Sequence, residues 1–197
     1  MPPYNAEISA GSLMPLESKR VAALLLSRPD EVAWAYAIEV ENILQKKTPA
    51  TARRQATLLR KRLSAMDAQA WTMITERESE VVTQLLLAGA VKHSQLLGDF
   101  VRNVYATHQR RLELFIAASD WHDFLAECAH QDPAVTGWSD STKAKLFQVI
   151  IRILVESKYL ENARSMKLSP RSLHPAVRRY LSDRNETYVL DCLERAQ

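Results

Sequence analysis

Residues 46–62, KKTPATARRQATLLRKR, hold seven basic residues and no acidic one. Thr48 suits the N-cap of a helix, and Pro49 suits the first helical position, where no backbone N–H is needed. An apolar stripe then recurs at helical spacing and consists of Ala52, Ala56, Leu59 and Leu63. The stretch therefore predicts the turn and last helix of a helix-turn-helix, with basic residues opposite and beside the stripe.

A helix that is anchored by one face and basic on the other is typical of helices that bind phosphates or enter the major groove. The expected DNA contacts of this block are Lys46, Lys47, Arg53, Arg54, Arg60 and Lys61. Arg53, Arg54 or Gln55, near the start of the helix, are the candidates for reading base edges. The alternative is a solvated helix face, because Arg and Lys form helices well on any surface.

The rest of the chain also favours helices. Only four glycines occur in 197 residues, and apolar residues recur with helical periodicity along most of the sequence. Two of the glycines, Gly89 and Gly98, fall inside helical patterns, where close packing or, at Gly98, a kink would explain them. We expect a mainly α, compact fold with at most a few very short strands, near residues 5–8 and 164–172.

Residues 139–157, SDSTKAKLFQVIIRILVES, form a second informative segment. Its helical pattern places a polar face at Ser141, Lys145, Gln148 and Arg152. The short basic stretch 164–172 follows and is interpreted as two short strands around Pro170. A helix followed by a small basic hairpin indicates a winged helix, here over 139–175, and adds Lys145, Gln148, Arg152, Lys167 and Arg171 to the expected DNA contacts.

The sequence divides, on this interpretation, into a helix-turn-helix-like lobe at 1–66 and a helical lobe at 67–197, which ends in the winged-helix-like segment and terminal helices. The charge alternates along it. The net charge is −3 over 1–45, +7 over 46–62, −5 over 63–139 and +6 over 140–184. Two basic blocks separated by acidic stretches predict two positive patches, and a polyanion is their natural partner.

Patterns for catalysis, nucleotides and metals are missing. The chain has no glycine-rich phosphate loop, no CxxC pair and no two histidines spaced four residues apart. We therefore expect no enzyme, no cofactor and no small-molecule substrate. The two cysteines form no disulfide framework, and no run approaches the ~18–20 apolar residues that span a bilayer. These features predict a cytoplasmic protein without a membrane partner.

Three motifs carry a resemblance to a known family. They are LQKKTPATARR at 44–54, KHS at 92–94 with LGDF at 97–100, and WS at 138–139 with KL at 145–146 and RIL at 152–154. In this order they resemble the BrxA family of bacterial BREX phage-defence systems, from Tyr4 to about residue 181. The resemblance implies a small helical protein with winged-helix-like parts that binds double-stranded DNA. It also implies other BREX proteins as partners, within a system that methylates host DNA and blocks phage replication, and it carries over no catalytic residue.

Three other functions compete with DNA binding. An assembly adaptor would use the same basic blocks to meet acidic proteins of the defence complex. An RNA-binding protein would use the same surfaces, but the sequence lacks the usual modules that stack single-stranded bases. An enzyme of unknown type lacks any recognisable set of catalytic residues.

Overall fold

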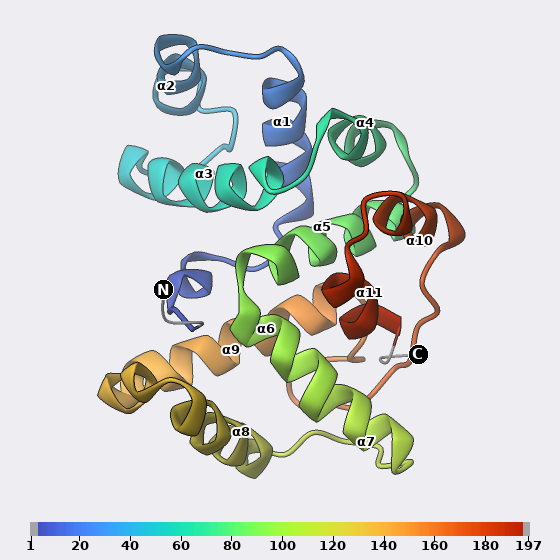
Figure 1. Cartoon of the computed structure of the whole chain (residues 1–197). Helices are drawn as coiled ribbons and strands as arrows, with labels where there is room; N and C mark the ends of the chain where they lie inside the picture. Colours follow the sequence, from blue (N-terminus) through green and yellow to red (C-terminus); the bar gives the residue numbers. More distant parts are fainter. Residues whose placement is uncertain (1–3, 195–197) are drawn as a thin grey trace.

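The computed structural model describes residues 4–194, and most of these residues are helical (Figure 1). The α-helices are α1 (Pro15–Leu26), α2 (Glu31–Glu39), α3 (Pro49–Ser64), α4 (Ala68–Glu76), α5 (Ser79–His93), α6 (Gln95–Phe100), α7 (Ala106–Arg110), α8 (Ala118–Gln131), α9 (Asp140–Glu156), α10 (Pro175–Ser182) and α11 (Thr187–Glu194). Short 3-10 helices lie at η1 (Glu7–Ala10) and η3 (Pro133–Gly137), and a π-helical turn lies at η2 (Val101–Tyr105). The prediction of a mainly α fold is confirmed.

Several helices begin where the sequence places a cap. The side chains of Asp30, Thr48 and Ser139 each accept a hydrogen bond from the backbone N–H three residues later, at the starts of α2, α3 and α9. Such a bond satisfies one of the donors that the first helical turn leaves free. Pro15 and Pro49 occupy the first helical position of α1 and α3.

Helix α5 lies at the centre of the molecule. It lies between α1–α4 at one end and α6–α9 at the other, with α10 and α11 alongside (Figure 1). All residues from Val81 to Val91 are buried except Thr83, as expected for a helix covered on every side. A Cβ atom at Gly89 would lie 3.3 Å from the carbonyl oxygen of Arg62. Close packing against α3 therefore accounts for this glycine.

Helices α6, η2 and α7 follow one another without a break. A Cβ atom at Gly98 would lie 2.4 Å from the hydroxyl oxygen of Tyr188 on α11. Gly98 therefore allows α11 to pack closely, and the change to π-helical geometry begins only after Phe100. Four aromatic rings then join α6, α8 and α9 in one cluster, in which Trp121 stacks on Phe147 with ring centroids 5.4 Å apart; the cluster is Phe100, Trp121, Phe124 and Phe147.

Strand pairing among residues 4–194 is limited to two isolated antiparallel bridges, Phe115 with Lys167 and Leu160 with Leu168. The expected strand at 5–8 is wrong. Residues Glu7–Ala10 form a 3-10 helix instead, and the side chain of Asn5 accepts a hydrogen bond from the Glu7 N–H at its start. The strand pairing expected at 164–172 is limited to two residues. Lys167 pairs with Phe115, and Leu168 pairs with Leu160.

Candidate nucleic-acid interface

Helix α9 presents a polar face to solvent. Leu146, Ile150 and Leu154 are buried on one side, which fixes the helix against the aromatic cluster and the core. The opposite side carries four exposed residues, Ser141, Lys145, Gln148 and Arg152, which we call the α9 face. The predicted polar face is therefore exposed along about three helical turns.

The cations of the α9 face have little competition from carboxylates. Lys145 donates to the side-chain oxygen of Gln148 at 3.1 Å and forms no ion pair with any residue in the described range 4–194. Arg152 lies 3.3 Å from Glu156, but its side chain is 72% exposed. The same Glu156 carboxylate accepts shorter bonds from the Ser12 hydroxyl and the Leu13 N–H, at 2.7 and 2.8 Å. Arg152 is therefore held only weakly.

Residues 161–167, which we call the wing, form the loop after α9 that the bridge between Leu160 and Leu168 closes. At its base the Leu168 N–H donates to the Leu114 carbonyl at 2.8 Å, and the Glu161 N–H donates to the Lys167 carbonyl at 2.9 Å. From α6 onward the chain thus runs through the continuous helices α6 to α7, the bridge residue Phe115, the helices α8 and α9, and the hairpin that contains the wing. The segment before α8 that contributes Phe115 has no distinct strand pattern in the sequence.

The remaining predicted residues of the second block lie apart from one another. Lys167 pairs with Glu161 across the base of the wing at 2.7 Å. Arg171 lies beyond the wing and lines a cavity of about 540 Å³ with Lys158, Glu80 and Glu156. Arg164 at the wing tip and Lys158 after α9 fall in no helical pattern, so neither is among the contacts that the sequence predicts.

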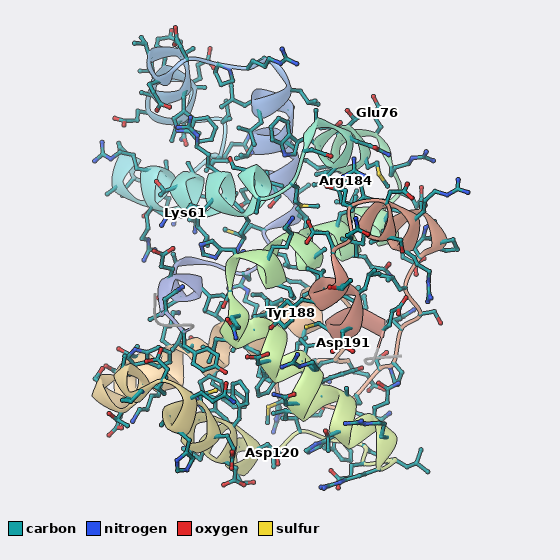
Figure 2. All side chains as sticks on the ribbon, viewed as in Figure 1. Lys61, Glu76, Asp120, Arg184, Tyr188 and Asp191 are labelled. Atoms are coloured by element: carbon teal, nitrogen blue, oxygen red, sulfur yellow. The ribbon has the colours of Figure 1, made fainter. Side chains whose placement is uncertain are left out.

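The first basic block is largely neutralised within the molecule. Lys46 pairs with Glu17, Arg53 with Glu39 at 2.9 Å, and Lys61 with Glu7 at 2.8 Å; Figure 2 labels Lys61. The fourth pair is bidentate, because Arg60 donates to both carboxylate oxygens of Glu31. Arg60 also stacks over the Trp34 ring at 4.4 Å. These pairs join η1, α1 and α2 to α3 or the turn that precedes it.

Three predicted residues of this block make no ion pair in the part of the chain that the structure describes. Lys47 and Arg54 are exposed, and Gln55 is half-buried with its side-chain oxygen shielded from solvent and without a hydrogen-bond partner. A buried oxygen cannot read a base edge. On α3, Arg53, Arg60 and Lys61 are thus held by carboxylates at 2.6–2.9 Å, whereas on the α9 face the single ion pair among the described residues, between Arg152 and Glu156, is longer at 3.3 Å.

Arg62, in the same run, is part of the core. Its guanidinium donates to the carbonyl oxygens of Ser12 and Gly11, and the residue is 3% exposed. Burial lowers the pKa of Arg62 to about 10, against the opposing attraction of Glu156. One cation of the basic run therefore holds the segment before α1 instead of facing solvent.

The Lys92, His93 and Ser94 motif joins three parts of the chain. Lys92 pairs with Glu186 before α11, the His93 imidazole lies 3.1 Å from a Glu7 oxygen, and Ser94 caps α6 through the Leu97 N–H. Hydrogen bonds from Lys61 lower the pKa of Glu7, and His93 adds to this effect. Two ion pairs and a helix cap thus account for the motif.

Histidine, cysteine and carboxylate groups do not gather as metal ligands among residues 4–194. A separate cavity of about 310 Å³ lies between α7 and α8, lined in part by Asp123 and Glu127. The His108 imidazole, at its edge, lies 2.9 Å from Asp120, which is labelled in Figure 2 and also accepts from the Ala117 N–H. Asp120 thus ties the first turn of α8 to α7.

Comparison with known proteins identifies the family. The BrxA family model matches residues 2–185. The chain belongs to the BrxA family. Relatives named BREX protein BrxA come from Paramagnetospirillum magneticum, 39% identical over 98% of this chain and 97% of the relative, and from Escherichia coli, 31% identical over 97% and 90%. A third, from Bacillus cereus, is 29% identical over 86% of this chain and 85% of the relative.

The fold of this BrxA-family chain has a solved counterpart. The crystal structure of an uncharacterized protein from Magnetospirillum magneticum superposes with a TM-score of 0.92 and 37% sequence identity. It covers 98% of this chain and 100% of the other. Among residues 4–194, every helix is too short or too polar to cross a membrane.

Proposed function

We propose that this BrxA-family protein binds double-stranded DNA through the α9 face and the wing, as a non-enzymatic component of a BREX phage-defence system. The observation that carries the proposal is the exposed, weakly paired basic face of α9 directly before a basic hairpin. Phosphate groups bind where cations are accessible, and a cation already held by a carboxylate must first give up that partner. The pairing on the α9 face is looser than on α3, since Lys145 has no carboxylate partner among the described residues and Arg152 lies 3.3 Å from Glu156, whereas three cations of α3 are held at 2.6–2.9 Å.

The proposed binding is tolerant of sequence. Lys145, Arg152 and Arg171 are suited to phosphate contacts, which position a protein on a duplex without reading its bases, and Lys167 would exchange Glu161 for a phosphate. Each such contact contributes about −0.9 to the slope of log affinity against log salt, so four contacts give a slope of roughly −3.6. Gln148, in the middle of the α9 face, is the side chain placed to reach a base edge.

The test compares two triple variants in a mobility-shift assay on random duplex DNA at several salt concentrations. Lys145→Ala, Arg152→Ala and Lys167→Ala together should weaken binding at least about tenfold and flatten the slope by roughly 2.7. The matched control is Arg53→Ala, Arg60→Ala and Lys61→Ala, which removes the same charge from α3. Equal loss in both variants, or no loss in the first, would contradict the assignment of DNA binding to α9.

A second candidate function, assembly with other BREX proteins, is favoured by α2. Seven of the nine residues of α2 are apolar, yet only Ala37 and Ile38 are buried. Val32 and Tyr36 on α2 form a stripe with Val40, the residue that follows the helix, and their exposed fractions are 80%, 55% and 65%. An apolar helix covered on one side only is typical of a surface that meets a partner.

The adaptor function predicts a separation of effects. Changing Val32, Tyr36 and Val40 together to Ser should abolish association with purified proteins of the same BREX system and leave affinity for duplex DNA unchanged. The matched control changes Leu112 and Leu114 to Ser, since these residues are also apolar and exposed but lie before α8. Association that survives the α2 changes would rule out this surface.

A further inference from the structure

The tip of the wing is held in a fixed shape. The side-chain oxygen of Asn162 accepts hydrogen bonds from the backbone N–H groups of Arg164 and Ser165, at 3.0 and 2.9 Å. The Met166 N–H donates to the Asn162 carbonyl at 3.0 Å and closes the turn. An Asx turn of this kind fixes the local backbone without help from the rest of the protein. The direction of the Arg164 Cα–Cβ bond is thereby set.

Arg164 is the accessible cation of this tip. Its side chain is exposed and forms no ion pair with any residue in the described range. The other cation of the wing, Lys167, is held by Glu161 at the base. An exposed arginine on a rigid turn is thus available to an external anion. Because its backbone is already fixed, binding costs little backbone conformational entropy.

The base of the wing is clamped to the end of α9. The Tyr159 N–H donates to the Leu154 carbonyl in the last turns of α9, and the Tyr159 carbonyl accepts from the Ser169 N–H and the Tyr105 hydroxyl, at 2.8 and 2.9 Å. The aromatic rings of Tyr105 and Tyr159 also pack edge to face, 5.4 Å apart. The hairpin therefore keeps a fixed position relative to α9.

Dimensions of B-DNA decide where the tip reaches. The wing joins the paired residues Leu160 and Leu168, and residues 163–165 form the turn that carries Arg164. When α9 lies in the major groove, a hairpin held at the end of α9 lies beside one phosphate backbone, and its tip faces the adjacent minor groove, which is about 6 Å wide. A single arginine side chain fits a groove of that width.

We propose that Arg164 enters the minor groove beside the segment bound by α9 and makes the protein prefer A·T-rich sequence there. A-tracts have a narrow minor groove with enhanced negative potential, which attracts an inserted arginine. Arginine suits this position better than lysine, because the guanidinium is more weakly hydrated. The inference rests on the proposed DNA binding through α9, and it adds a sequence preference at positions that no side chain of α9 contacts.

The test uses two duplexes with the same mixed-sequence centre, one flanked by A-tracts and one by G·C pairs. The wild-type protein should bind the A-tract duplex about five- to tenfold more tightly, in line with shape-dependent recognition. Arg164→Ala should reduce this ratio to near one, and Arg164→Lys should leave it intermediate. Netropsin, a small molecule that occupies A·T minor grooves, should remove the preference of the wild-type protein and have no such effect on Arg164→Ala.

Arg179 supplies the matched control, because it is an exposed arginine on α10 without an ion pair to any described residue. Arg179→Ala should keep the full preference for the A-tract duplex. A wild-type protein that binds both duplexes equally, or an Arg164→Ala variant that loses the same affinity on both, overturns the minor-groove assignment and leaves DNA binding intact. A wild-type protein that binds neither duplex contradicts the proposed function itself.

Discussion

The guanidinium of Arg62 donates to the carbonyl oxygens of Gly11 and Ser12 in the core. Removing it would leave both carbonyls without a partner and would open space beneath α3. We expect Arg62→Ala to lower the free energy of unfolding by about 3 kcal/mol, measured by urea denaturation. The exposed Arg54 is the control, and Arg54→Ala should change the free energy by no more than about 0.5 kcal/mol. Similar small effects from both variants would show that Arg62 is not a structural residue.

His93 predicts a pH dependence of stability. Burial lowers the pKa of His93, the nearby charge of Arg62 lowers it further, and Glu7 opposes this effect. Because the unfolded chain then binds a proton more readily than the folded one, the stability that the neutral imidazole contributes is present above about pH 6.5 and is lost as the pH falls below it.

Urea denaturation at pH 7.5 and pH 5.5 measures this loss. The wild-type protein should lose more stability between the two pH values than His93→Gln, which cannot titrate. Equal losses in the two proteins would mean that His93 is protonated as easily in the folded state as in the unfolded state. His122, exposed on α8, provides the control, since His122→Gln should keep the wild-type pH dependence.

At the scale of elements, the packing of α6 against α11 depends on Gly98. A methyl group there would lie 2.4 Å from the Tyr188 hydroxyl, which is itself bonded to Asp99 at 3.0 Å. We expect Gly98→Ala to lower the free energy of unfolding by about 1–3 kcal/mol through overpacking, measured by chemical denaturation. Gly137→Ala is the matched control, because nothing lies within 4 Å of a Cβ atom there. Equal stability of the two variants would show that α11 moves aside without cost.

Elements that depend on local sequence were predictable. The cap at Ser139, the buried side of α9 and the polar face at Lys145 and Arg152 all follow from residue spacing along one helix. Two other features depend on distant residues. Phe115 pairs with Lys167 through a single residue, so the sequence shows no alternation of apolar and polar residues there. The cations of α3 and of the turn before it pair with carboxylates in η1, α1 and α2. The basic residues of α3 are therefore visible in the sequence, but their acidic partners are not.

At the scale of the whole molecule, Asp99 joins segments from both ends of the chain. This carboxylate is 2% exposed and accepts hydrogen bonds from the hydroxyls of Tyr4 and Tyr188, at 2.9 and 3.0 Å. Arg102, one helical turn further along the chain, donates to it at 2.9 Å. Figure 2 shows Tyr188 beside Asp191 on α11, and Arg102 also lies 3.9 Å from the Asp191 carboxylate. The segment before η1 and the last helix thus share one buried charge.

This shared charge predicts a coupled response to Asp99→Asn. An amide keeps the shape of the side chain but replaces one acceptor oxygen with a donor group, which faces a tyrosine hydroxyl or the Arg102 guanidinium. We expect the free energy of unfolding to fall by about 2–3 kcal/mol, since buried polar networks lose most when they are partly satisfied. Amide hydrogen exchange should speed up both before η1 and in α11, while α2 stays unchanged. The exposed Asp123 gives the control, and Asp123→Asn should alter neither segment. Faster exchange in only one of the two segments would show that they are held independently, because a common anchor must release both.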